Sequence, residues 1–229
     1  MTRIARAVVT LALLHAAPAA LGFAQTRPVN RPDRFEVSFG GMWIGGADVG
    51  STRAEIRANN VTPAPFRLFS AETRAASAPG WDARVGYWLT RSVAVEGSFA
   101  RLSPELRTRI SDDAEGSAAL TATERLHQYF IDGRVVWLLP QFKFGRTVPF
   151  VSGGAGYLRQ LHEGRTLVET GQVYHAGGGV RHQLVADVGW FGSIGARLDG
   201  RVYVLVDGVQ LEDRPRTHGA FSGSVFLTF

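Results

Sequence analysis

Apolar side chains alternate with small or polar ones over long stretches of this chain, and such a period of two is typical of β-strands with unlike faces. In RFEVSFGGMWIGG, which begins at Arg34, the odd positions from Phe35 to Trp43 are mainly apolar, and Glu36 and Ser38 lie opposite. The same alternation recurs in seven further segments: 81–90, 92–102, 127–139, 149–157, 174–182, 190–205 and 221–229. The pattern predicts an all-β chain of eight strands.

The connections between these segments differ in length in a regular way. An up-and-down antiparallel barrel sorts its connections, with short turns at one rim and long loops at the other, whereas a Greek-key sandwich does not. We therefore predict one eight-stranded barrel domain at 34–229. Long polar connections are expected at 50–79, 103–124, 160–173 and 206–217, and short ones at 90–92, 140–147 and 184–189.

The N-terminal residues are typical of an export signal. Arg3 and Arg6 precede an apolar run at 8–14, and small residues at 22–24 provide a cleavage site. We predict a secretory signal peptide at 1–24, followed by a short periplasmic segment at 25–33. No later segment has the ~20 unbroken apolar residues of a membrane helix. Because the chain has no cysteine, a disulfide scaffold is excluded.

Aromatic residues on the apolar face gather toward the two ends of the predicted strands, with aliphatic residues and glycine between them. Trp and Tyr rings prefer the headgroup level of a membrane, so two aromatic belts around an aliphatic band indicate a barrel in lipid. We favour a transmembrane barrel over a soluble barrel with an apolar calyx, although alternation alone permits both. The predicted belts comprise Phe35, Trp43, Trp81, Tyr87, Phe99, Tyr129, Trp137, Tyr157, Trp190 and Phe221.

The opposite face carries charges in the middle of the strands. Charged groups inside a narrow barrel are costly unless they are paired, and here five acids meet five arginines. Eight strands enclose a space that side chains fill, so we expect a plugged lumen. The predicted charge network comprises Glu36, Asp82, Arg84, Glu96, Asp132, Arg134, Arg181, Arg197, Asp199 and Arg201.

These segments together resemble the small outer-membrane β-barrels of Gram-negative bacteria, namely the OmpA/OmpX-like and porin-family barrels of eight strands. The resemblance rests on VGYWLTRSVAVEGSF at the first short turn, PFVSGGAGYL in the fifth strand, the arginine-rich seventh strand and the closing FSGSVFLTF. It implies localisation in the outer membrane and contact with its lipids and lipopolysaccharide. In that family a final strand ending in Phe is read by the barrel-assembly machinery, so the resemblance assigns this signal to Phe229, with Leu227 and Val225 in support.

No catalytic, cofactor or metal site is predicted. The glycine clusters at 153–156 and 177–179 match no phosphate-binding loop. An enzyme is the disfavoured class, because no set of nucleophile, base and acid is recognisable. Two histidines, His162 and His175, are expected near the third long connection beside Glu163, but their spacing fits no metal-ligand motif, and the same holds for His127, His182 and His218.

Function is expected to lie mainly in the long loops. In 50–79, apolar Ile56 and Phe66 stand beside Arg53 and Arg67. A strand extension above the membrane is favoured there, and a surface for an extracellular partner or for lipopolysaccharide phosphates is the alternative. The net charge of +5 includes no basic block, which argues against nucleic acid.

We predict a monomeric outer-membrane barrel with a structural and surface-interaction role. A passive small-solute channel, or an OmpW-like transporter of apolar ligands, is the alternative. A lipid-modifying barrel enzyme and a soluble periplasmic calyx barrel rank below it. Arg101 and Arg159, on the lipid-facing parity near the long-loop rim, are expected to reach toward anionic headgroups.

Overall fold

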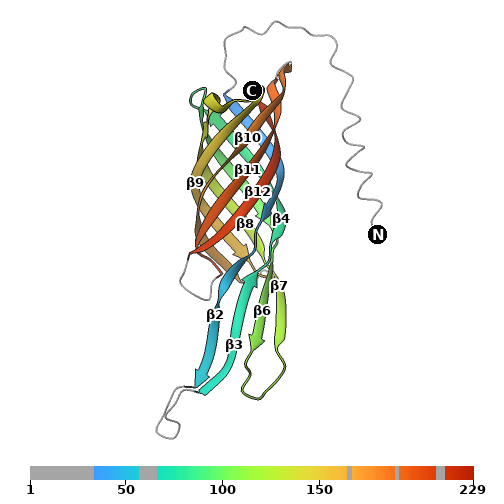
Figure 1. Ribbon diagram of the computed structural model, residues 1–229, viewed down its shortest axis with the longest axis vertical. Coiled ribbons are helices and arrows are strands. Elements are labelled where there is room, and N and C mark those ends of the chain that lie inside the picture. Colours follow the sequence, from blue (N-terminus) through green and yellow to red (C-terminus); the bar gives the residue numbers. More distant parts are fainter. Residues whose placement is uncertain (1–33, 57–65, 164–166, 189–190, 210–214) are drawn as a thin grey trace, which may run out of the picture. The chain divides into compact units, whose positions relative to one another are not determined.

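The computed structural model describes residues 34–56, 66–163, 167–188, 191–209 and 215–229 and shows them to be largely β-strand (Figure 1). The predicted signal peptide at 1–24, the segment at 25–33 and Trp190 lie outside the described residues. The strands are β1 (Phe35–Ile44), β2 (Ala47–Ile56), β3 (Phe66–Ala75), β4 (Ala78–Trp88), β5 (Val93–Leu102), β6 (Glu105–Ser111), β7 (Leu120–Arg125), β8 (His127–Leu138), β9 (Thr147–Leu161), β10 (Val168–Val188), β11 (Phe191–Asp207) and β12 (Arg216–Thr228), and a short 3₁₀ helix, η1, spans Pro140–Phe142.

Eight of the strands form a closed barrel in the order β1-β12-β11-β10-β9-β8-β5-β4, and β4 pairs again with β1. Every neighbouring pair in this order is antiparallel. The predicted all-β fold and the eight-stranded up-and-down barrel are therefore confirmed. No helix in the described part of the chain is long and apolar enough to cross a membrane.

The last strand closes the barrel against the first. β12 pairs with β1 from Glu36 opposite Thr228 to Ile44 opposite Ala220. The Phe229 backbone N–H donates to the Phe35 carbonyl at 2.8 Å, and the Phe35 N–H donates to the Phe229 carbonyl at 3.3 Å. Because no water reaches a strand edge in the hydrocarbon core, this pairing satisfies backbone groups that nothing else would satisfy.

The other four strands form a second antiparallel sheet in the order β2-β3-β6-β7, which we call the rim sheet. Only Gly45 and Gly46 separate β1 from β2, and only Leu126 separates β7 from β8. The rim sheet thus continues the barrel strands beyond one rim, here named the sheet rim, and the opposite one is the short-turn rim. The strand extension favoured for 50–79 is confirmed over the described residues of that segment.

Three further expected connections contain strands, and one of them, 103–124, holds β6 and most of β7. The long connection at 160–173 is mostly strand, because β9 runs to Leu161 and β10 begins at Val168. The turn expected at 184–189 is likewise strand as far as Val188. The reason is that strands near a rim extend beyond the apolar band. Outside that band, polar side chains are tolerated on both faces. Alternation in burial still continues there, since the inward Gln160 and Val173 are both 0% exposed.

The outward face of the barrel is apolar and exposed. Trp43, Trp137 and Phe221 are 44%, 58% and 64% exposed. Soluble proteins rarely expose large contiguous apolar patches, so this wall is a surface for lipid. Phe35 lies opposite Tyr87 at the short-turn rim, and Trp43 lies opposite Phe221 at the sheet rim. The structure places every predicted belt residue except Trp190 on this face, half-buried or exposed.

Candidate functional site

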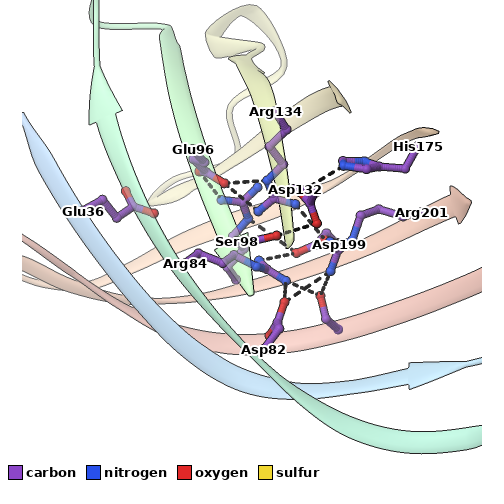
Figure 2. A network of polar contacts seen from close by, with 12 residues as sticks. Glu36, Asp82, Arg84, Glu96, Ser98, Asp132, Arg134, His175, Asp199 and Arg201 are labelled. Carbon is purple, nitrogen blue, oxygen red and sulfur yellow. Dashed lines mark hydrogen bonds and ion pairs between the residues drawn. The ribbon is translucent and has the colours of Figure 1, made fainter. Parts of the chain in front are cut away.

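The inward face of the barrel carries a buried network of ion pairs (Figure 2). Asp199 of β11 is at its centre. One carboxylate oxygen lies 2.9 Å from Arg84, and the other lies 2.9 Å from Arg201. Arg197 and Arg134 approach the same carboxylate at 3.5 Å and 3.8 Å. A single acid therefore attracts guanidinium groups from β4, β8 and β11.

Two further acids balance these arginines. Glu96 of β5 accepts hydrogen bonds from Arg134 and Arg197, each at 2.7 Å. Asp82 of β4 pairs with Arg84, and it lies 3.3 Å from Arg201. Because burying a charge is costly unless it is paired and hydrogen-bonded, the near-balance of acids and arginines is what allows this arrangement inside a barrel.

A separate ion pair lies toward the short-turn rim. Glu36 accepts hydrogen bonds from Arg181 at 2.9 Å and from the Trp88 indole N–H at 3.2 Å. The Arg181 guanidinium stacks 3.9 Å from the centroid of the Phe226 ring. This pair links β1, β4, β10 and β12 across the barrel. All ten residues of the predicted network lie on the inward face, mostly buried, with nine of them under 9% exposed.

The structure adds residues to this network that the sequence analysis did not assign to it. Asp132 accepts a hydrogen bond from the Ser98 hydroxyl at 2.7 Å and lies 3.1 Å from His175 Nε2. His175 lies within β10, in agreement with the strand predicted at 174–182, and its side chain is 5% exposed and faces the lumen. A sequence signal existed, since His175 has the same odd parity on this strand as Arg181.

Glycine on β10 makes room for the network. Gly177 and Gly179 share the inward parity, and a Cβ atom at these positions would lie 2.9 Å from Arg201 Cγ and 2.8 Å from Asp199 Cβ. Such distances are too short for real contacts, so glycine is the residue that fits beside these charged side chains. Gly177 and Gly179 of the cluster at 177–179 are thereby explained by packing in the barrel interior, whereas Gly178 has the outward parity.

Two apolar layers lie on either side of the charges. Toward the short-turn rim, a buried cluster joins Ala94, Val136, Leu138 and Phe150, with Trp88 and Val148 packed against it. Toward the sheet rim, the lumen is filled by Met42, Ile44, Ala78, Ala100, Leu102, Phe130, Leu158, Val173, Tyr203, Leu205 and Ala220. The described lumen residues therefore form three layers, of which the charged layer is the central one.

The rim sheet has two unlike faces. On one face Val49, Ala75 and Leu106 are buried in a cluster with Leu126 and Val209. The Val209 N–H donates to the inward Gln160 at 2.8 Å, so this face covers the mouth of the barrel. The other face is polar and continues the outward face of the barrel, with an ion pair between Arg74 and Asp48 at 2.7 Å. This polar face is the exposed face of the described rim sheet.

A cleft of 840 Å³ lies beside this polar face. Its basic lining consists of Arg74, Arg107, Arg109 and Arg216, and its acidic lining consists of Asp48 and Glu72. Arg74 lies directly opposite Arg107 across β3 and β6. Like charges in this position repel each other, and each arginine has an acidic partner: Asp48 lies 2.7 Å from Arg74, and Glu105 lies 3.0 Å from Arg107.

The described histidines form no recognisable metal or catalytic site. His162 Nδ1 lies 2.9 Å from Glu124, and its Nε2 lies 3.7 Å from Glu169. His182 contacts the Thr147 hydroxyl, and His218 contacts the Gly45 carbonyl. Within the described residues, no group of three or more His, Asp or Glu side chains is arranged to hold a metal ion.

No protein-family model matches the sequence, and no curated protein matches it. The fold is similar to that of Neisserial surface protein A, NspA, with a TM-score of 0.52 and 11% identity over 85% of this chain and 97% of that one. It is also similar to the outer-membrane protein OprG from Pseudomonas aeruginosa, with a TM-score of 0.45 and 10% identity over 86% and 97% of the two chains. The outer-membrane protease OmpT from Escherichia coli has a TM-score of 0.37 and 9% identity over 86% and 97%.

The fold shared with NspA, the lipid-facing exterior and the charged interior define the class of this protein. It is a closed eight-stranded antiparallel β-barrel with an exposed apolar wall, and its fold is similar to that of NspA. The predicted resemblance is confirmed at the level of the fold.

Proposed function

We propose that this barrel has a structural and surface-interaction role in the outer membrane, with a closed lumen and with the rim sheet on the outside of the cell. The filled lumen is the observation that carries this proposal. On the sheet-rim side of the charged layer, Phe130 and Tyr203 are 0% exposed, and on the short-turn side Phe150 is 2% exposed. A solute would have to displace apolar side chains and separate ion pairs to pass.

Planar-bilayer recording of the purified protein tests the closed lumen. We expect no stable conductance steps at moderate voltage, whereas a porin reconstituted in the same way gives them. Stable and sizeable steps from the wild-type barrel would contradict the proposal. A catalytic role is not part of the proposal.

The proposed surface role is supported by the polar face of the rim sheet. The side chains of Arg74 and Asp48 are 71% and 76% exposed, and those of Arg107 and Glu105 are 60% and 45% exposed. Cells that express a variant with β2–β3 and β6–β7 replaced by short turns should lose the adhesion that wild-type cells show. Unchanged adhesion of these cells would contradict the surface role, and so would a rim sheet that added protease does not cleave on intact wild-type cells.

One observation favours the transport alternative. A recess of 700 Å³ in the wall is lined by Trp43, Phe221 and Leu198 around Gly41 and Gly223, and it is mainly apolar. An apolar ligand fits such a recess by burial of its surface. Uptake of an apolar fluorescent probe into vesicles tests this function, and filling the recess by Gly41→Leu should slow any uptake.

A further inference from the structure

We propose that the outer wall of the barrel binds a membrane lipid with a phosphate-bearing headgroup, at a site built on Arg101 of β5 and Arg159 of β9. This inference concerns the lipid-facing wall near the sheet rim. It therefore goes beyond the proposed surface role, and it holds or fails independently of the lumen and of the rim sheet.

The two arginines flank one aromatic ring in a single row across the strands. Trp81 lies opposite Arg101, Arg101 opposite Tyr129, and Tyr129 opposite Arg159. Neighbouring strands are about 4.8 Å apart, so the two arginine backbones are about 10 Å apart. The Arg101 guanidinium lies 5.7 Å from the centroid of the Tyr129 ring, which directs it along the wall.

No other arginine has this position. On the described parts of the eight barrel strands, the remaining arginines all face the interior, and only Arg101 and Arg159 face outward. The corresponding place on the wall of β1 and β12 holds Trp43 opposite Phe221, without a charge. The two outward arginines therefore mark one side of the barrel, and they are not part of a uniform basic ring.

These arginines lack an acidic partner of their own. Neither forms an ion pair with any described acid, whereas the exposed Arg74 and Arg107 of the rim sheet each have one. A charge on the lipid-facing wall lowers stability, and more so the deeper it lies. Two positive charges in one row also repel each other. An anion supplied by the surrounding lipid would remove both costs.

The surroundings identify this anion as part of a lipid. The next row toward the middle of the wall consists of Phe99, Ile131 and Tyr157, and Ile131 and Tyr157 are 56% and 44% exposed. Acyl chains would pack on this row while the headgroup phosphate meets the guanidinium groups. Arginine suits that contact, because its planar fork donates two hydrogen bonds to one phosphate.

Lipid binding to the purified full-length barrel in non-ionic detergent tests the proposal, with bound lipid counted by native mass spectrometry. Dioleoyl phosphatidic acid is the probe, and dioleoyl glycerol and inorganic phosphate are its two halves. We expect the combined substitutions Arg101→Gln and Arg159→Gln to weaken phosphatidic acid binding about 25-fold, at about fivefold for each arginine near a charged membrane surface. Arg91→Gln, in the turn at the opposite rim, should leave binding unchanged.

The outcomes separate the sources of the phosphate. Equal binding of dioleoyl glycerol would overturn the proposal, as would an equal loss in Arg91→Gln. Competition by inorganic phosphate at the concentration of the lipid would show a site for free phosphate and overturn the lipid assignment. Heat-modifiable migration checks that each variant is folded, and Arg101→Lys with Arg159→Lys, which keeps both charges, should retain part of the affinity.

Discussion

At the scale of single residues, Asp199 shows how this barrel tolerates a charged interior. Four guanidinium groups lie within 3.8 Å of its carboxylate, two of them at 2.9 Å. A buried pair of this kind adds little net stability when it is intact, because desolvation offsets the attraction. Losing one partner is different, since the remaining charges stay buried without compensation.

The substitution Asp199→Asn should therefore destabilise the barrel by about 3–5 kcal/mol. Asp48→Asn is the matched control, because Asp48 also pairs with an arginine. The side chains of Arg74 and Asp48 in that pair are 71% and 76% exposed. Its expected cost is below about 1 kcal/mol. Urea-induced unfolding in lipid vesicles measures both changes. Similar losses in the two variants would show that burial of the network does not determine its strength.

At the scale of strands, the closing strand is required for the barrel, whereas the rim sheet is not. Val225 and Leu227 of β12 are the register partners of Phe39 and Val37 of β1. Without them the edge of β1 would face lipid with unpaired backbone groups, each costing several kcal/mol. The connection between β6 and β7 has no such task, because it lies outside the barrel.

Deletion of 225–229 should therefore abolish the folded, heat-modifiable form of the protein. Deletion of five residues at 113–117, between β6 and β7, should leave that form intact. Semi-native gel electrophoresis of both variants after refolding measures the difference. A folded band from the variant without 225–229 would contradict the closure argument.

Alternation of residues predicts the barrel strands well, because one face must meet lipid and the other must fill the lumen. It fails near the rims, where one face no longer has to meet lipid and the other no longer has to fill the lumen. At Gln160 and Glu169, beyond the apolar band, both faces accept polar residues, so strands were predicted as loops. The interior was predictable in composition but not in contacts. That Asp132 meets His175 depends on the register between β8, β9 and β10, which parity within one strand does not determine.

At the scale of the whole molecule, the arrangement is inside-out relative to a soluble protein. Five tryptophans allow this to be measured. Trp137 faces outward and is 58% exposed. Trp88 is half-buried on the inner side, where it donates a hydrogen bond to Glu36. The two residues lie near the same rim, so their depth in a membrane is similar and their facing is the main difference.

Two variants that each keep one of these residues, with the other tryptophans replaced by phenylalanine, should therefore differ in vesicles of lipid with brominated acyl chains. We expect strong quenching of Trp137 fluorescence and weak quenching of Trp88, because bromine quenches on contact. A variant that keeps only Trp43 should be quenched as Trp137 is, since it faces outward at the other rim and is 44% exposed. Stronger quenching of Trp88 than of Trp137 would contradict the assignment of the outward face to lipid and would favour the soluble calyx barrel.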